Sequence, residues 1–274
     1  MVDFDFERLK AEFLEGVNSA AESVSSAARD VSDDVKRFKR FIELGRDLFV
    51  SHAITSHGGN ISETNGKSIW ISCSGAMLGH LTPGAIVETA WAVDARDARA
   101  STELVVHRAM YQAFAARLAA APAAYPAAYS ATYQSAAPFV APIPAPVAPE
   151  NAAGASPKTD SPVNCTAAIV HAHPAHTIAR SLIDDEIRPI DAEGKLVCGE
   201  RIPVVRVEKA VASIDVARCM AKLVAEGVCM AVVAGHGPFA IAATLEDAFR
   251  LISCLERSAE ILDILDRTNQ TRKC

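Results

Sequence analysis

The chain has 274 residues, of which 50% are hydrophobic and 22% are charged. This composition allows a sizeable buried core and excludes a chain that is disordered over its whole length. The seven cysteines include no CxxC pair, which argues against a disulfide framework or a cysteine-ligated zinc site. The net charge of −6 gives no indication of a nucleic-acid partner, and we expect none.

The N-terminal segment, residues 1–35, carries the whole net charge, with nine acidic and three basic residues. Its acidic start lacks the apolar stretch of a signal peptide, and prolines interrupt the most apolar part of the chain, so we expect a cytoplasmic protein without a membrane span. Apolar residues from Phe6 to Val17 recur every three or four positions. This spacing predicts an amphipathic helix, which either packs on another surface or forms a mobile extension.

The following sequence alternates apolar strands with helices. In chain order we expect a helix at residues 36–53, a strand at 69–73, a helix at 101–116, a strand at 167–173, a helix at 175–182, a strand at 202–207, a helix at 213–226, a strand at 228–234 and a helix at 244–265. Ser101 or Thr102, and Thr244, precede helices as candidate N-caps. The alternation predicts one layered α/β domain over residues 36–266, with a C-terminal tail at residues 267–274.

Residues 119–162 interrupt this domain with nine of the fourteen prolines and sixteen alanines. Because proline lacks a backbone donor and blocks both helix and sheet, we expect residues 136–149 to be extended, polyproline-like and exposed. We interpret the segment as an insertion, which forms either an exposed loop or a lid over a site.

A pair of histidines marks the end of the strand predicted at residues 167–173. Side chains two apart in a strand point to the same face, so His171 and His173 project together just before Pro174. Two imidazoles placed in this way can share one metal ion.

A third histidine follows the strand predicted at residues 228–234. His236 lies between Gly235 and Gly237, which allow the backbone to run close to a bound ion or ligand. If this strand neighbours the one that ends near His171, the three imidazoles form a site with an open fourth position, as in catalytic zinc centres. Taken alone, His236 also fits an ordinary turn.

Three further segments are suited to an anion such as phosphate. They are the glycine turn at residues 56–62, the segment Ile71-Ser-Cys-Ser-Gly75 and the hydroxyl pair before Glu103. Exposed N–H groups, hydroxyl groups and a helix N-terminus are the donors that anions bind. Each segment taken singly is also compatible with a capped loop.

Six motifs together resemble the class II aldolase/adducin family. They are GGNIS (58–62), SCSGAMLGHLTP (72–83), ASTELVVHRAMY (100–111), AIVHAHP (168–174), DDEIRPIDAEGK (184–195) and GHGPFAIAATLEDAF (235–249). They occur in the family's order over residues 36–116 and 164–266, and they are most similar to those of fuculose-1-phosphate aldolases.

The resemblance implies a single-domain α/β/α fold with a mixed, largely antiparallel central sheet. It implies one Zn²⁺ or another divalent metal per subunit, with Glu103 as catalytic carboxylate and as a fourth ligand when no substrate is bound. The implied metal ligands are His171, His173 and His236. The implied phosphate-binding residues are Gly59, Asn60, Ser74, Gly75, Ser101 and Thr102. It also implies a homotetramer with sites at subunit boundaries.

The implied reaction is cleavage of a ketose 1-phosphate similar to fuculose 1-phosphate, giving dihydroxyacetone phosphate and an aldehyde through a metal-stabilised enediolate. Another enzyme on the same scaffold is an alternative: a pentulose-phosphate 4-epimerase, a methylthioribulose-phosphate dehydratase or a decarboxylase. The family's epimerases tend to place aspartate where Glu103 stands, so this glutamate favours the aldolase. The complete histidine set argues against a non-enzymatic, adducin-like interaction module.

One departure concerns the proton donor to the aldehyde. The family's aldolases supply a tyrosine after the paired histidines, from a neighbouring subunit, whereas this chain has no tyrosine after Tyr133. His176, Asp191 or a tyrosine of the insertion could replace it. The sequence leaves this donor and the sugar open.

Overall fold

The computed structural model describes residues 32–120 and 165–271. The chain divides into two units, residues 1–41 and residues 42–274. Of the first unit, the described residues belong to the start of a helix that spans residues 32–50. The helix predicted between Phe6 and Val17 and almost all of the predicted insertion lie outside the described residues.

The second unit is built on a sheet in which the described residues supply eight strands. In chain order they are β1 (Asn60–Thr64), β2 (Ile69–Ser72), β3 (Ile86–Thr89), β4 (Ala167–His171), β5 (Glu186–Ile187), β6 (Ile202–Val205), β7 (Met230–Val233) and β8 (Gly237–Ala242). Their order across the sheet is β3-β2-β1-β4-β8-β7-β6-β5. Only β6 and β7 pair in parallel among these strands, which confirms the mixed, mostly antiparallel sheet.

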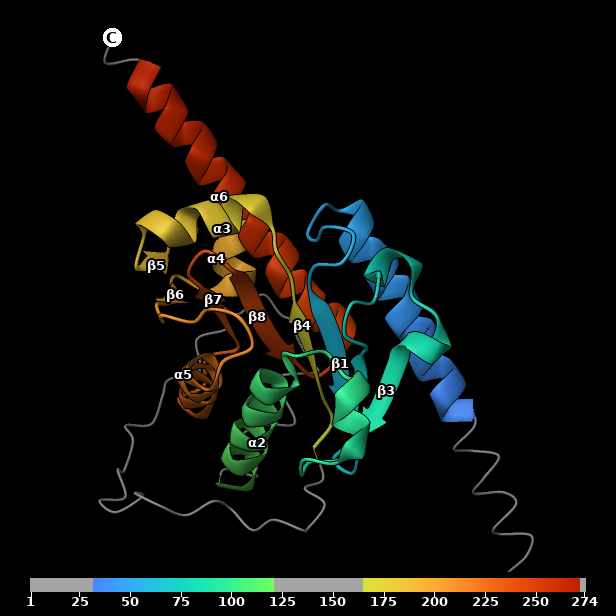
Figure 1. The fold of residues 1–274 in the computed structure, drawn as a ribbon. Helices are drawn as coiled ribbons and strands as arrows, with labels where there is room; N and C mark the ends of the chain where they lie inside the picture. Colours follow the sequence, from blue (N-terminus) through green and yellow to red (C-terminus); the bar gives the residue numbers. More distant parts are fainter. Residues whose placement is uncertain (1–31, 121–164, 272–274) are drawn as a thin grey trace, which may run out of the picture. The chain divides into compact units, whose positions relative to one another are not determined.

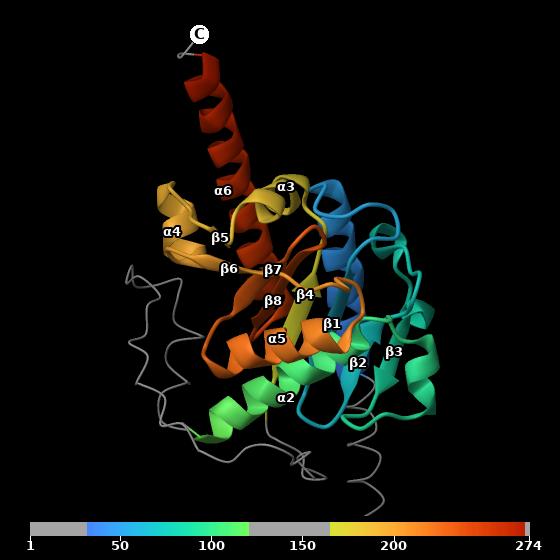
Figure 2. The ribbon, with the colours of Figure 1, turned by 60° about the vertical axis from the view of Figure 1, so that its left-hand side comes forward.

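Helices cover both faces of this sheet. The α-helices of the second unit that lie wholly within it are α2 (Leu104–Ala120), α3 (Ala175–Ile183), α4 (Ala192–Cys198), α5 (Ile214–Ala225) and α6 (Leu245–Thr271). Figure 2 shows α2 and α5 side by side across one face, while α6 and α3 pack on the other (Figure 1). The α/β/α layering predicted from the sequence is therefore confirmed.

The main apolar core lies between the sheet and the α2–α5 layer. Strand residues such as Ile71, Ile169 and Ile241 pack there against Met110 of α2 and Met220 of α5. Burying such side chains contributes on the order of 1.5–3 kcal/mol each to the free energy of folding.

None of the helices in the described ranges has the length and apolar character needed to cross a membrane.

Hydroxyl side chains cap the N-termini of two of the predicted helices. Ser213 caps α5 by accepting a hydrogen bond from the Val216 N–H, and Thr244 accepts one from the Asp247 N–H at the start of α6. Helix α2, predicted to begin at residue 101, starts three residues later at Leu104, after a turn at residues 102 and 103. These hydroxyl groups satisfy backbone donors that a helix N-terminus leaves free.

Several elements differ from the sequence predictions. Strands β1, β3, β5 and β8 and helix α4 were not expected, and the predicted insertion begins two residues inside α2. Helix α6 continues to Thr271, so residues 267–271 are helical rather than part of a tail. Strand β4 ends at His171, which places His173 beyond the strand.

The register brings three chain segments to one end of the sheet. Asn60, the first residue of β1, pairs with His171, the last residue of β4. His171 also pairs with Phe239 near the start of β8, and Gly237 pairs with Val233 at the end of β7. The start of β1, the end of β4 and the turn between β7 and β8 therefore lie together.

A carboxylate of α6 ties this helix to the start of α3, directly after this end of the sheet. Glu256 accepts hydrogen bonds from the His176 N–H, the Thr177 N–H and the Thr177 hydroxyl group, at 2.8–3.0 Å. We expect Glu256→Ala to lower the free energy of unfolding by about 2 kcal/mol, because it leaves helix N–H groups without their charged acceptor.

Urea denaturation measures this loss. Glu260→Ala is the matched control, since Glu260 pairs on the exposed face of the same helix with Arg257 and is worth less than about 1 kcal/mol there. Equal losses in the two variants would contradict the role of Glu256.

Candidate metal centre

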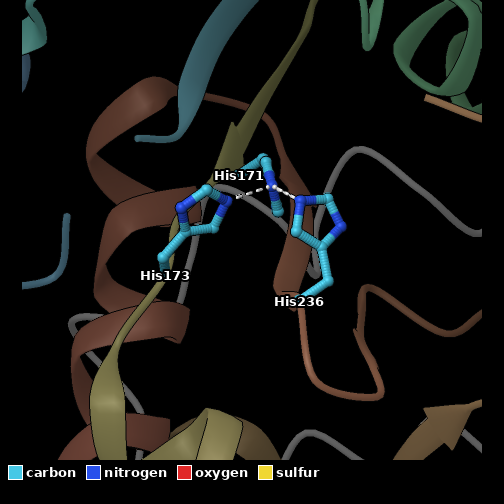
Figure 3. Close-up of side chains that lie close together, drawn as sticks. All are labelled: His171, His173 and His236. Atoms are coloured by element: carbon cyan, nitrogen blue, oxygen red, sulfur yellow. Dashed lines mark hydrogen bonds between the residues drawn. The ribbon is translucent and has the colours of Figure 1, made fainter. Parts of the chain in front are cut away.

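Three imidazoles converge at the end of the sheet defined above (Figure 3). The Nε2 atom of His171 lies 2.9 Å from Nε2 of His173 and 3.2 Å from Nε2 of His236. The candidate ligand atoms of all three histidines lie within 4.8 Å of one another. The chain therefore brings together the three histidines that the sequence singled out.

The strand arrangement behind this convergence differs from the predicted one. His236 lies in the turn between β7 and β8, and β8, not β7, is the neighbour of β4. His173 follows β4 after one intervening residue, and its N–H donates to the Ala53 carbonyl at 2.8 Å. The hairpin return of β8 therefore carries His236 back to the end of β4.

The spacing and the tautomer of these rings fit a metal ion. Zinc bound tetrahedrally at ~2.0–2.1 Å separates imidazole nitrogens by roughly 3.3 Å, close to the two observed contacts. The His171 Nδ1 atom lies 2.9 Å from the Pro238 carbonyl oxygen, to which it donates. The lone pair of His171 Nε2 is then directed at the other two rings, because a hydrogen bond from the outer ring nitrogen fixes the tautomer of a metal-binding histidine.

Burial keeps the three rings neutral. It lowers the pKa of His173 to about 4 and holds the pKa values of His171 and His236 below that of a free histidine. The neutral imidazole is the form that binds a metal ion, so no proton has to be displaced near neutral pH.

Glycines allow the backbone around the histidines to pack this closely. A Cβ atom on Gly237 would lie 2.1 Å from the Ala172 carbonyl oxygen, and one on Gly59 would lie 2.7 Å from the His171 carbonyl oxygen. Both glycines have positive φ angles, 147° and 76°. A Cβ on Gly58 would meet the His173 ring at 2.7 Å. These positions require glycine because any side chain would displace the segment that carries two imidazoles.

Glu103 lies beside the imidazoles, as the resemblance implied. Its Oε2 atom is 3.8 Å from His171 Nε2, and its Oε1 atom is 3.9 Å from His236 Nε2. Oε1 accepts the Ala212 N–H at 2.8 Å, whereas the buried Oε2 has no hydrogen-bond partner among the described residues. A carboxylate with one orphaned oxygen, next to two of three clustered imidazoles, completes a donor set that a divalent cation satisfies.

The environment of Glu103 also adjusts its acidity. Burial raises the pKa of Glu103 to about 7, although the hydrogen bond from Ala212 opposes this shift. Ala212 itself has a positive φ of 47°, an uncommon angle for alanine. No signal in the sequence points to this residue, because an alanine in a loop carries no functional group to read.

The predicted phosphate-binding segments lie next to one another. The Ile61 N–H donates to the Ser72 hydroxyl at 3.3 Å, and the Ser101 N–H donates to the Ser72 carbonyl at 3.0 Å. The Ser74 N–H donates to the Arg99 carbonyl at 3.0 Å. The three segments that contain the predicted phosphate-binding residues therefore meet at strand β2.

These segments offer polar groups to a ligand. The buried Asn60 Oδ1 atom has no hydrogen-bond partner in the described part of the chain, and Ser74, Gly75 and Thr102 lie at the surface. An open surface pocket of about 430 Å³ is lined in part by Ser74, Gly75 and Arg99. The segments could hold an anion here, and their assignment to phosphate stays a prediction.

Two of the candidate proton donors are already engaged. His176 Nδ1 lies 2.7 Å from a carboxylate oxygen of Asp263. Asp191 caps α4 by accepting the Gly194 N–H at 2.7 Å and also accepts the Ser258 hydroxyl at 2.6 Å. The tyrosines of the insertion lie outside the described residues.

Comparisons with known proteins agree with this architecture. The sequence profile of the Class II Aldolase and Adducin N-terminal domain matches residues 39–136 and 164–262. L-fuculose-1-phosphate aldolase from Thermus thermophilus is similar in structure, with a TM-score of 0.62 and 25% identity over 85% of this chain and 95% of that chain.

Two other solved structures share the fold at lower identity. YgbL from Klebsiella pneumoniae, described as a putative aldolase/epimerase/decarboxylase, has a TM-score of 0.59 and 21% identity over 85% of this chain and 90% of that chain. A sugar-phosphate aldolase from Thermotoga maritima has a TM-score of 0.54 and 14% identity over 84% of this chain and 95% of that chain. No curated protein sequence matches the chain.

The close packing of Gly237 generates a prediction about the metal centre. We expect Gly237→Ala to weaken zinc affinity by at least about tenfold, because the new methyl group displaces the Ala172 backbone between two imidazoles. Competition with a chromophoric zinc chelator measures the affinity.

Gly199→Ala is the control, since Gly199 also has a positive φ but has open space around its Cβ position. It should lose about 1 kcal/mol of stability to backbone strain and keep its zinc affinity. Unchanged affinity in Gly237→Ala would show that the glycine does not govern the site.

Proposed function

Because the chain belongs to the class II aldolase and adducin N-terminal domain family, we propose that it is a zinc-dependent aldolase. It cleaves a ketose 1-phosphate similar to fuculose 1-phosphate into dihydroxyacetone phosphate and an aldehyde. The observation that carries the proposal is the convergence of three imidazole nitrogens beside the orphaned carboxylate oxygen of Glu103. The similarity to a fuculose-1-phosphate aldolase at 25% identity supports the substrate class.

His171, His173 and His236 would hold the metal ion, and Glu103 can serve as a fourth ligand when no substrate is bound. Three histidines and one exchangeable position are typical of catalytic zinc. When bound, the ion supplies a Lewis acid that stabilises the negative charge developing on the substrate as the carbon–carbon bond breaks.

Glu103 moves the proton in this proposal. Its Oε2 atom is the free acceptor, because Oε1 already accepts the Ala212 N–H. Oε2 takes the proton of the substrate hydroxyl, the carbon–carbon bond breaks, and the electron pair stays on the phosphate-bearing fragment. The carboxylic acid then returns the proton to the carbon of that fragment, so the enzyme ends in its starting state.

The substrate phosphate is held by the segments that meet at β2. The residues assigned to it are Gly59, Asn60, Ser74, Gly75, Ser101 and Thr102. N–H and hydroxyl donors hold the phosphate in position, so that binding energy far from the reacting bond orients the substrate.

We extend the proposal to a cytoplasmic homotetramer with sites at subunit boundaries. Two apolar residues at the end of α3, Leu182 and Ile183, are 61% and 71% exposed. A Cβ atom on Gly235, next to His236, would contact the Leu182 side chain at 3.1 Å. An apolar surface beside the histidine turn supports a subunit contact near the site.

Another reaction on the same scaffold is the second candidate. The chain has no tyrosine after Tyr133, the residue type that family aldolases use toward the aldehyde. The missing tyrosine weighs against the aldolase, and the alternatives on this scaffold are a pentulose-phosphate 4-epimerase, a methylthioribulose-phosphate dehydratase or a decarboxylase. The three retained histidines and Glu103 speak against an adducin-like interaction module.

Replacing the carboxylate tests the assignment of Glu103. We expect Glu103→Gln to keep its zinc and to lose at least about 100-fold in turnover, because the amide cannot accept the proton. Release of dihydroxyacetone phosphate from a panel of ketose 1-phosphates measures the turnover. Glu88→Gln is the control, since Glu88 is an exposed glutamate on β3, the edge strand of the sheet.

Equal turnover in Glu103→Gln and the native protein would remove Glu103 from this role. A protein that stays inactive toward every ketose 1-phosphate after zinc addition would overturn the aldolase. Epimerisation, dehydration or decarboxylation of a sugar phosphate by the same zinc-loaded protein would establish the second candidate instead.

A further inference from the structure

A buried polar cluster lies between α2 and β1, behind the metal centre. The Ser62 hydroxyl oxygen is 2.7 Å from His107 Nδ1 and 2.7 Å from the Tyr111 hydroxyl oxygen. All three side chains are completely buried. We name these three residues the His107 network.

Burying the polar atoms of this network lowers the stability of the fold, so a functional role would explain why the network is kept. Burial lowers the pKa of His107 to about 3, so its ring is neutral, and its Nε2 atom has no hydrogen-bond partner within the described ranges. Buried polar atoms without a partner destabilise a protein by roughly 1–3 kcal/mol each. Apolar side chains of similar size would fill the same space without that cost, as they do elsewhere in this core.

One connection from the network leads to Glu103. Helix α2 begins directly after Glu103, and the His107 N–H donates to the Glu103 carbonyl at 3.2 Å. The contact of His107 with Ser62 therefore fixes the first turn of α2 against β1. Because β1 pairs with β4, with Ser62 opposite Ile169, the contact also fixes Glu103 relative to the strand that ends in His171.

A second connection leads to His171 through an aromatic ring. Phe239 stacks on His171 with ring centroids 3.9 Å apart and an angle of 11° between the planes. His107 approaches the same phenylalanine edge-on, at 6.0 Å and 77°. Phe239 thus contacts both histidines, and its position sets the plane of the His171 ring.

We propose that the His107 network is a positioning device that holds Glu103 and the ring of His171 in register with each other. His107, Ser62 and Tyr111 touch neither substrate nor metal and act through Glu103 and Phe239. The inference about His171 rests only on the metal centre, whereas the inference about Glu103 rests also on the proposed function. A displacement of about 1 Å between a base and its reaction partner can cost on the order of 100-fold in rate, so such a device has a kinetic benefit.

Two variants of the network test the proposal. Tyr111→Phe removes the phenol hydroxyl and keeps the ring, and Ser62→Ala removes the hydroxyl that both partners contact. Thr64→Val is the matched control, because Thr64 is also buried on β1 and its hydroxyl donates to the Ser68 carbonyl at 2.7 Å, away from α2. Thermal denaturation of each variant shows the stability loss that any buried hydrogen bond produces.

The first readout needs no substrate. The protein is loaded with Co²⁺, and the visible absorption bands and the Co²⁺ affinity are measured, since both report the geometry of the ligands. We expect both network variants to change the bands and to lose about tenfold in affinity, as substitutions of the residues that orient metal ligands do. Thr64→Val should keep the bands and the affinity of the native protein.

The second readout is steady-state cleavage of the best ketose 1-phosphate. We expect kcat to fall about tenfold in the network variants, with KM within about twofold, because the phosphate-holding segments stay in place. Stability losses in Tyr111→Phe and Ser62→Ala with native bands, affinity and kcat would overturn the positioning role. A native protein that binds Co²⁺ without cleaving any substrate would refute the proposed aldolase, and the bands would still decide the role of the network at His171.

Discussion

The close approach of two glycine backbones to residues 171–173 is the constraint on which the rest of the site depends. Gly59 lies against the His171 carbonyl, and Gly237 lies against the Ala172 carbonyl from the opposite neighbouring strand. Because both approaches exclude a side chain, β1 and β8 can flank β4 up to its last residue. The turn before β8 then returns His236 to the imidazoles that β4 carries. The clustering of the three histidines is thus a consequence of backbone packing in the sheet.

Burial determines the electrostatics of this centre. It keeps the three imidazoles neutral and raises the pKa of Glu103 to about 7. The overall charge of the chain does not attract an anionic substrate, because the net charge of −6 resides in residues 1–35. Neutral imidazoles beside a carboxylate suit a divalent cation, and the local N–H and hydroxyl groups near Ser72 are what an anionic substrate would meet. The carboxylate and the ring of His171 are in turn backed by the buried network around His107.

The sequence predicted the layered fold and the three histidines because both leave periodic or paired signals. Strand β1 was not predicted because the sequence Asn60–Thr64 is mostly polar. Its polar side chains can be buried because their hydrogen-bond partners come from another element, as His107 does for Ser62. Strand β8 was not predicted because it begins with Gly237 and Pro238, which signal a turn, and is buried on both faces without alternation. The role of Ala212 could not be predicted, since it depends on a backbone N–H and a φ angle.

The identity of the metal ligands is the central claim. X-ray absorption at the zinc edge of the zinc-loaded protein tests it most directly, because the spectrum reports ligand type and distance without any substrate. The account predicts three imidazole nitrogens at about 2.0–2.1 Å, completed by one or more oxygen ligands. His171→Ala should remove one imidazole from the spectrum. A sulfur ligand at about 2.3 Å, or an unchanged imidazole count in that variant, would contradict the account.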